Sequence, residues 1–177
     1  KGWAISDWGG IYVSTDGGTS WAKQKSNTEE DLIDIAMLGD GQKGWVVGWG
    51  GTIVNTVDGG ETWTQQSSGV DSTLNSVWFV DDNHGAVSGN GGVILNTTDG
   101  GTTWTQQTST VENDLLGIFF LDSQNGWAVG AKSMVINTSD GGATWAQQET
   151  THSADSLRGI MFTSVDSGLT AGSGGRI

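Results

Sequence analysis

The sequence contains no cysteine and no proline, and only 34% of its 177 residues are hydrophobic. The lack of cysteine excludes disulfide bonds and thiolate chemistry, and the lack of proline argues against a polyproline segment or a proline-rich linker. With so little apolar material, a core must be assembled from many short segments. The ten tryptophans make up part of the deficit, because each can bury about 200 Å². We therefore expect a chain that is folded throughout.

Positive charge is also scarce. Seven basic residues stand against 20 acidic ones, which gives a formal net charge of -13. A surface this negative repels phosphate backbones and anionic lipid headgroups, so we expect no nucleic-acid partner. No apolar run approaches the roughly 20 residues that cross a bilayer, and we expect no membrane insertion.

A motif built around Asp-Gly-Gly and tryptophan occurs four times. One copy is NTTDGGTTWTQQTS at residues 96–109, and the aspartates of successive copies lie 41 or 42 residues apart. Such self-similarity at a fixed period indicates a repeat architecture. The aspartate and the tryptophan of the four copies are Asp16 and Trp21, Asp58 and Trp63, Asp99 and Trp104, and Asp140 and Trp145.

Other segments repeat with the same spacing. A Gly-Trp-like step precedes each aspartate by 13 or 14 residues, and an apolar segment precedes most of these steps. Each unit thus holds four short stretches rich in β-branched and aromatic residues, separated by turn residues and too short for helices. In one unit we expect strands at 74–80, 86–89, 93–97 and 103–107, with Trp78 in the core beside Phe79.

Four strands in about 40 residues are typical of one propeller blade. The sequence therefore predicts an all-β fold, a β-propeller of four-stranded antiparallel blades. We expect one propeller domain, or a fragment of one, over residues 1–177. The approximate repeats are 1–25, 26–67, 68–108, 109–149 and a partial unit at 150–177.

The motif Ser/Thr-x-Asp-Gly-Gly-x-Thr-Trp resembles the Asp-box, or BNR repeat, of sialidases, sortilin-type receptors and xyloglucanases. The longer unit, in which Gly-Trp-Ala-Val-Gly precedes the box, is most similar to the Ycf48-type family of photosystem II assembly and stability factors. The resemblance implies a closed ring of six to eight blades, of which this chain holds about four. We expect the chain to be part of a longer protein rather than one of several chains that complete a ring. It also implies an extracytoplasmic location: secreted, periplasmic or at the cell surface, or in the thylakoid lumen for a true photosystem factor.

The box itself is expected to be structural. An aspartate at the start of a tight turn can accept hydrogen bonds from the turn's own N–H groups, and paired glycines supply positive φ. The tryptophan that follows can pack between blades. The alternative is calcium binding, but each loop offers one carboxylate and lacks the further acidic ligands that a calcium loop needs. We therefore predict a structural role for the four aspartates and four tryptophans of the boxes, and no metal site.

No catalytic residue is predicted. A sialidase needs three arginines and a tyrosine nucleophile, whereas this chain has two arginines, Arg158 and Arg176, and one tyrosine, Tyr12, in a predicted strand. A xyloglucanase-like hydrolase needs two facing carboxylates, and the acidic runs at 29–31, 81–82 and 112–114 are expected to be solvated loops. His84 and His152 lie in different repeats without a ligand-spaced partner. We expect no cofactor.

A binding site is expected at the end of the blades opposite the boxes. The loops between second and third strands differ among the copies while the framework does not, and such loops commonly carry function. Trp8 and Trp49 are extra to the framework and could stack on a sugar or anchor a protein partner, although they could equally cover backbone. Lys132 and Arg158 are among the few cations and could steer an acidic partner. The candidate binding residues are Asp7, Trp8, Trp49, Asn90, Lys132 and Arg158.

Three functions remain open. The first is a non-catalytic extracytoplasmic propeller that binds a protein partner, as an assembly factor or a cell-surface structural component. The second is a carbohydrate-binding or adhesion module that uses the exposed tryptophans. The third is part of an Asp-box glycoside hydrolase whose catalytic acids lie partly outside this segment.

Overall fold

The computed structural model describes residues 1–150 and 155–173, which form β-sheets joined by turns and three short 3₁₀ turns. Each sheet follows the chain order, and we number the sheets as the first to fifth blade. The first two blades contain β1 (Gly2–Ser6), β2 (Gly10–Ser14) and β3 (Ala22–Lys25), then β4 (Leu32–Met37), β5 (Gly44–Gly48), β6 (Ile53–Thr56) and β7 (Thr64–Gln66). The third contains β8 (Leu74–Phe79), β9 (Gly85–Gly89), β10 (Ile94–Thr97) and β11 (Thr105–Gln107). The last two contain β12 (Leu115–Phe120), β13 (Gly126–Gly130), β14 (Val135–Thr138) and β15 (Ala146–Gln147), then β16 (Leu157–Ser164) and β17 (Ser167–Gly172).

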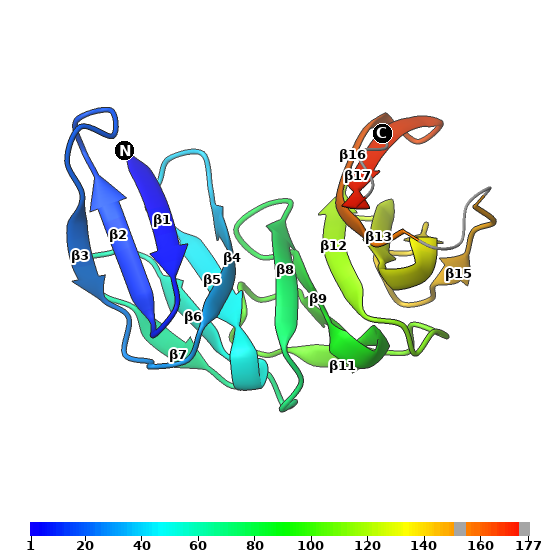
Figure 1. Ribbon diagram of the computed structural model, residues 1–177, viewed down its shortest axis with the longest axis horizontal. Coiled ribbons are helices and arrows are strands. Elements are labelled where there is room, and N and C mark those ends of the chain that lie inside the picture. The colour runs from blue at the N-terminus through cyan, green and yellow to red at the C-terminus, as the bar shows by residue number, and fades with distance from the viewer. Residues whose placement is uncertain (151–154, 174–177) are drawn as a thin grey trace.

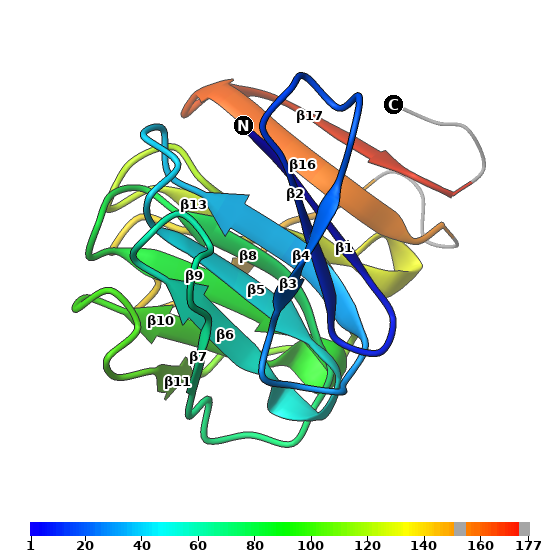
Figure 2. The same ribbon diagram turned by 90° about the vertical axis from the view of Figure 1, so that its left-hand side faces the viewer.

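The second, third and fourth blades are four-stranded antiparallel meanders, in which each strand pairs with the next along the chain. The blades follow one another in an arc, from β1–β3 at one side of Figure 1 to β16–β17 at the other. The first strands of successive blades, β4, β8, β12 and β16, lie next to one another at the inner side of this arc. Figure 2 shows the same stack from its N-terminal side. The fold is that of propeller blades, as predicted.

Burial within a blade follows from its position between two neighbours. All five residues of β5 are buried, and so are all five of β13, because both faces of a second strand pack against another blade. These strands therefore read as continuous apolar runs rather than alternating ones. The fourth strands are short and polar, and the last residue of β7 is only half-buried.

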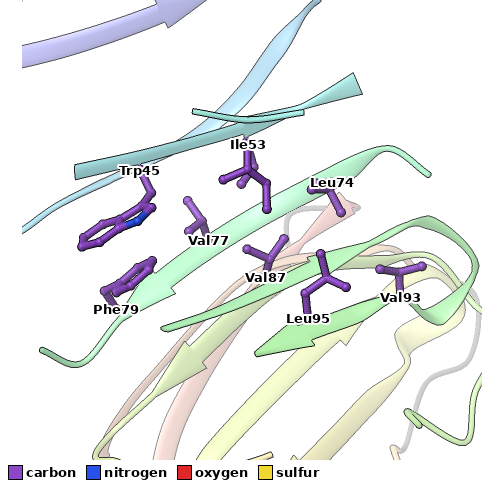
Figure 3. Packing of buried hydrophobic residues seen from close by; sticks show 9 residues of the cluster. Trp45, Ile53, Leu74, Val77, Phe79, Val87, Val93 and Leu95 are labelled. Atoms are coloured by element: carbon purple, nitrogen blue, oxygen red, sulfur yellow. The ribbon is translucent and has the colours of Figure 1, made fainter. Parts of the chain in front are cut away.

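The core consists of clusters between blades rather than one centre. Between the second and third blades, Trp45 stacks on Phe79 with ring centroids 3.5 Å apart (Figure 3). Ile53, Leu74 and Leu95 of the same cluster are fully buried. Each such aliphatic side chain contributes about 1.5–3 kcal/mol through its burial.

The strands of the third blade agree with the sequence expectation to within two residues. The expectation for Trp78 was wrong, because its side chain is 36% exposed. It lies in the first strand but leans against Phe119 of the next blade, at 4.8 Å between ring centroids.

No helix among the described residues is long and apolar enough to cross a membrane.

Candidate binding surface at the loop end

The connections of each blade lie at two opposite ends, because successive strands run in opposite directions. In the four-stranded blades, the turn between the third and fourth strands carries the Asp-Gly-Gly motif; in the first blade the turn between β2 and β3 carries it. We call this side the Asp-box end. The turn between the second and third strands (between β1 and β2 in the first blade) lies at the other side together with the link to the next blade, and we call this side the loop end. In the second blade the loop end holds the 3₁₀ turn η1 (Trp49–Gly51). In the third and fourth it holds η2 (Asn90–Gly92) and η3 (Ala131–Ser133).

At the Asp-box end, one network recurs in four turns. In the second blade the Thr56 hydroxyl donates to Asp58 Oδ1 (2.8 Å) and accepts the N–H of Gly60 (2.8 Å). Asp58 Oδ1 also accepts the N–H of Thr62 (2.9 Å), and its Oδ2 accepts the Thr62 hydroxyl (2.6 Å). Gly60 has a φ of +87°, which an L side chain rarely adopts.

These hydrogen bonds occupy the aspartates and stabilise their charged form. The hydroxyl of the Ser or Thr four residues on, followed by its N–H, lowers the pKa of Asp16, Asp58 and Asp140 to about 2. For Asp99 the N–H of Thr103 comes first, and its pKa is also lowered. Carboxylates held in this way are poor general acids near neutral pH, so their geometry supports a role in the turn.

Two of the four box tryptophans donate a hydrogen bond to the preceding blade, and the other two donate to their own turn. Trp63 is 1% exposed, and its Nε1 donates to Gln24 Oε1 of the preceding blade (3.1 Å). Trp104 Nε1 donates to Gln66 in the same way (3.1 Å). Trp145 is buried and Trp21 is 47% exposed, and each donates to a glycine carbonyl of its own turn: Gly142 at 3.0 Å and Gly18 at 3.2 Å.

At the loop end, the turns share a backbone shape but differ in side chains. The central residue has a left-handed conformation in each of the four copies within the described residues, and two copies use glycine there, Gly50 (φ +60°) and Gly91 (φ +68°). The other two place a large side chain in it, Trp8 (φ +58°) and Lys132 (φ +56°). A bulky residue in this conformation is strained by about 1–2 kcal/mol, and such strain concentrates at functional sites.

Asp31 holds Trp8 and Trp49 together at this end. Its carboxylate Oδ1 accepts the N–H of Trp8 (2.9 Å), and its main-chain carbonyl accepts the N–H of Trp49 (2.9 Å). The two side chains come from adjacent blades and are 80% and 53% exposed. Asp7 is exposed beside Trp8. These three predicted site residues are therefore brought to one surface, which we call the indole surface.

The other predicted residues lie further along the molecule. Asn90 opens η2, and its Oδ1 accepts a hydrogen bond from Asn75 Nδ2 (2.8 Å), so its side chain is committed within the blade. Lys132 is exposed in η3, at the same end. Arg158 is exposed in β16 and lines a hollow of about 390 Å³ between the first strands, which Asp34 also lines.

Sequence reasoning missed three aspartates that join blades. Asp31 was placed in a solvated run, yet its two hydrogen bonds connect the first and second blades. Asp114 does the same for the third and fourth blades, since its Oδ1 accepts Gly91 N–H and its carbonyl accepts Ala131 N–H, both at 2.9 Å. Asp31 and Asp114 each lie immediately before the first strand of a blade, and this shared position was the signal in the sequence that could have identified them. Asp34 accepts hydrogen bonds from Ser76 and Val77 of the third blade, and burial raises its pKa.

The described residues contain no group of three or more His, Asp or Glu side chains able to hold a metal ion. His84 instead pairs with Asp81 at 2.8 Å. Tyr12 lies in β2, as expected. His152, Arg176 and the end of the partial repeat lie outside the described residues.

The repeated turns, the meanders and their arrangement define an Asp-box β-propeller. The family model described as photosynthesis system II assembly factor YCF48 matches residues 13–108 and 104–173. Since these ranges cover most of the chain, the protein belongs to this family. No curated protein matches it.

Solved structures show the same fold. YCF48 from Cyanidioschyzon merolae superimposes with a TM-score of 0.77 at 18% identity, over 98% of this chain and 63% of that one. This chain thus spans less than two thirds of that relative. A structure described as YCF48 bound to D1 peptide gives a TM-score of 0.52 at 15% identity, over 96% and 86% of the two chains. The GH74 enzyme of Niastella koreensis gives 0.73 at 17% identity, over 98% and 31%.

Proposed function

We propose that this protein is a non-catalytic, extracytoplasmic scaffold that binds a protein partner through its loop end. The observation that carries the proposal is the indole surface, where Asp31 holds the main chains of two exposed tryptophans from adjacent blades. Exposed large aromatic side chains on one surface are typical anchors of protein interfaces. Membership of an assembly-factor family, and a structural relative described as YCF48 bound to D1 peptide, support a protein or peptide as the ligand.

The charges around the indole surface favour a basic partner segment. Asp7, Glu29 and Glu30 are exposed beside it and outnumber the two exposed lysines, Lys23 and Lys25, that line a hollow with Trp8. A Cβ added at Gly50 would lie 3.7 Å from the Glu30 carboxyl carbon. Indole rings flanked by carboxylates attract Lys and Arg side chains through cation–π and ionic interactions. The net charge of -13 would steer such a segment toward the protein.

A non-catalytic role is supported by the state of the acidic side chains. The four Asp-box carboxylates, Asp31 and Asp114 are all engaged with main-chain or hydroxyl donors. The likeness to GH74 enzymes concerns the fold, and one fold hosts many functions. Membership of the family supports the proposed extracytoplasmic location, with the thylakoid lumen as the compartment if the host is photosynthetic. Fractionation of the producing cells tests it.

Affinity capture from the producing cells tests the binding proposal. The baits are the wild-type protein, the double variant Trp8→Ala and Trp49→Ala, and the control Val57→Ala, which removes an exposed apolar side chain (64%) at the Asp-box end. We expect the wild type and the control to capture the same partner and the double variant to lose it, with circular dichroism unchanged in all three. An undiminished capture by the double variant would refute the assignment to the loop end.

A carbohydrate ligand is the second candidate, because two exposed indoles on one surface also suit stacking on sugar rings. A glycan array probed with the same three proteins decides between the candidates. Glycan binding that is lost in the double variant and kept in Val57→Ala would favour an adhesion module. An array without signal would exclude the carbohydrate candidate and favour a protein partner.

A further inference from the structure

Neighbouring blades are joined by a recurring pair of stacked rings. Trp45 of β5 lies flat on Phe79 of the next blade, with centroids 3.5 Å apart and ring planes 10° apart. Trp127 of β13 stacks in the same way on Phe162, at 3.7 Å and 9°. Trp45 Nε1 also donates to the carbonyl of Gly100, in the Asp-box turn of that next blade (3.2 Å). Figure 3 shows the Trp45–Phe79 pair.

The third blade lacks the tryptophan of this pair. Ala86 occupies the position in β9, and the strand register is the same. Ala86 pairs with Trp78 and Asn96, just as Trp45 pairs with Ala36 and Asn55. A tryptophan of this blade instead lies in the neighbouring first strand, β8, as Trp78. From there Trp78 reaches Phe119 and not Phe120, which is the counterpart of Phe79.

A cavity of about 330 Å³ lies where the indole ring is missing. Ala86 and Phe120 line it together with Gly141 of the fourth Asp-box turn, and the exposed Thr103 and Ser123 stand at its rim. Its volume falls within the range of small-molecule sites, about 300–1,000 Å³. Phe120 makes an edge contact with Trp145 (5.9 Å, 87°), as Phe79 does with Trp104 (5.9 Å, 89°). Among the described residues, no stacked ring covers the face of Phe120.

One residue that lines the cavity carries an unused hydrogen-bond acceptor. Asn96 lines it, and the side-chain Nδ2 of Asn96 donates to the carbonyl of Gly141 (2.9 Å). The Oδ1 of the same amide is buried and has no hydrogen-bond partner among the described residues. Leaving a buried acceptor unpaired is costly, so a ligand that brings an N–H or O–H group to this atom gains specificity as well as affinity.

We propose that this cavity binds a planar aromatic ring with a hydrogen-bond donor, such as an indole or a phenol. The ring takes the place of the missing tryptophan, stacks on Phe120 and donates to Asn96 Oδ1. This site lies between the third and fourth blades and is separate from the indole surface, so it goes beyond the proposed partner binding. The ring can come from a Trp or Tyr side chain of a protein segment or from a free aromatic molecule.

Calorimetric titration with indole tests the proposal, with indene as a matched ligand that has the same shape but no N–H. We expect indole to bind the wild-type protein and to raise its Tm with concentration. Indene should bind about tenfold more weakly, since one hydrogen bond to a buried acceptor is worth about that factor. N-acetyltryptophanamide separates the two sources: binding indicates that a peptide side chain can enter, and its failure beside indole binding indicates a free small molecule.

Variants that place a larger side chain in the cavity provide the control for specific binding. Ala86→Trp restores the ring found in the second and fourth blades, so we expect it to raise the Tm and to abolish indole binding. Ala86→Leu fills part of the same space and should weaken binding if the larger variant does not fold. The proposal is overturned if indole does not bind the wild-type protein, or if it binds both variants as strongly.

Discussion

The two ends of the blades use the same residue types for opposite purposes. At the Asp-box end, Trp63 is 1% exposed and Asp58 is held by its own turn. At the loop end, Trp8 is 80% exposed, and Asp31 holds the main chains of two exposed indoles. The copies share the Asp-Gly-Gly-x-x-Trp pattern at the Asp-box end, and they differ in the turns of the loop end. Repetition therefore identifies the framework, and departures from it identify the candidate sites.

The largest effect on stability is expected from Trp63→Ala. This change removes a buried indole between two blades and leaves Gln24 Oε1 without its donor. Removal of a buried Trp typically costs about 3–5 kcal/mol. Urea unfolding followed by circular dichroism measures the loss, and a change below about 1 kcal/mol would contradict the bracing role.

Acid should act mainly on the Asp-box end. The pKa of Asp16, Asp58 and Asp140 falls from 3.8 to about 2 on folding, so the unfolded chain binds more protons between these values. The stability that these three carboxylates contribute is therefore fully present above about pH 4 and is lost as the pH falls toward 2. The raised pKa of Asp34 acts in the opposite direction, but it is one group against several.

Thermal melts across this pH range provide the measurement. Asp58→Asn keeps the shape of the side chain and removes one titrating group, so its melting temperature should be lower than that of the wild type at pH 7 and should depend less on pH. An equal pH dependence of the two proteins would show that the turn carboxylates are not responsible.

A smaller, stabilising change is expected at the loop end from Trp8→Gly. Trp8 has a φ of +58°, where the equivalent positions hold Gly50 and Gly91. Relief of this strain, less the entropy lost on ordering a glycine, should stabilise the protein by about 0.5–1 kcal/mol. Trp8→Ala keeps the strain and serves as the matched control. A gain in Trp8→Ala as large as that in Trp8→Gly would mean that exposure of the ring, and not the backbone, limits stability here.

The smallest effect on stability is expected from Trp49→Ala. Its side chain is 53% exposed, and its hydrogen bond to Asp31 uses the main chain, which alanine retains. We expect a change within about 0.5 kcal/mol in the same urea titration. A loss of several kcal/mol would mean that Trp49 belongs to the framework.

The sequence could predict the blades because their period and turn chemistry are local. The Asp-Gly-Gly turns and the apolar second strands each follow from a short pattern, and the strands of the third blade agree closely with the expectation. The contacts that depend on the neighbouring blade could not be read in this way. Trp78 looked like a core residue, but its side chain is partly exposed. In the second blade the first strand carries the alanine and the second strand the tryptophan, whereas in the third blade Trp78 lies in the first strand and Ala86 in the second, and only the strand pairing reveals this reversal.

The sequence predicted that the candidate residues Trp8 and Trp49 lie at the loop end, but not the contacts that hold them there. The divergence of the loops pointed to Trp8 and Trp49, whereas the aspartate that holds both of them was assigned to a solvated run. Asp31 joins residues from different blades, and such long-range hydrogen bonds leave no spacing signal in a sequence. Arg158 was chosen for its positive charge alone, and the structure places it in β16, where it lines the hollow between the first strands.

Site-specific photo-crosslinking tests the central claim, that the loop end binds the partner and the Asp-box end does not. A p-benzoylphenylalanine is placed at position 49 in one variant and at position 57 in another, both at side chains that are more than half exposed. The variants are then irradiated in the cells that naturally produce the protein. The account predicts a discrete partner adduct from position 49 and none from position 57. An adduct formed only from position 57 would contradict it.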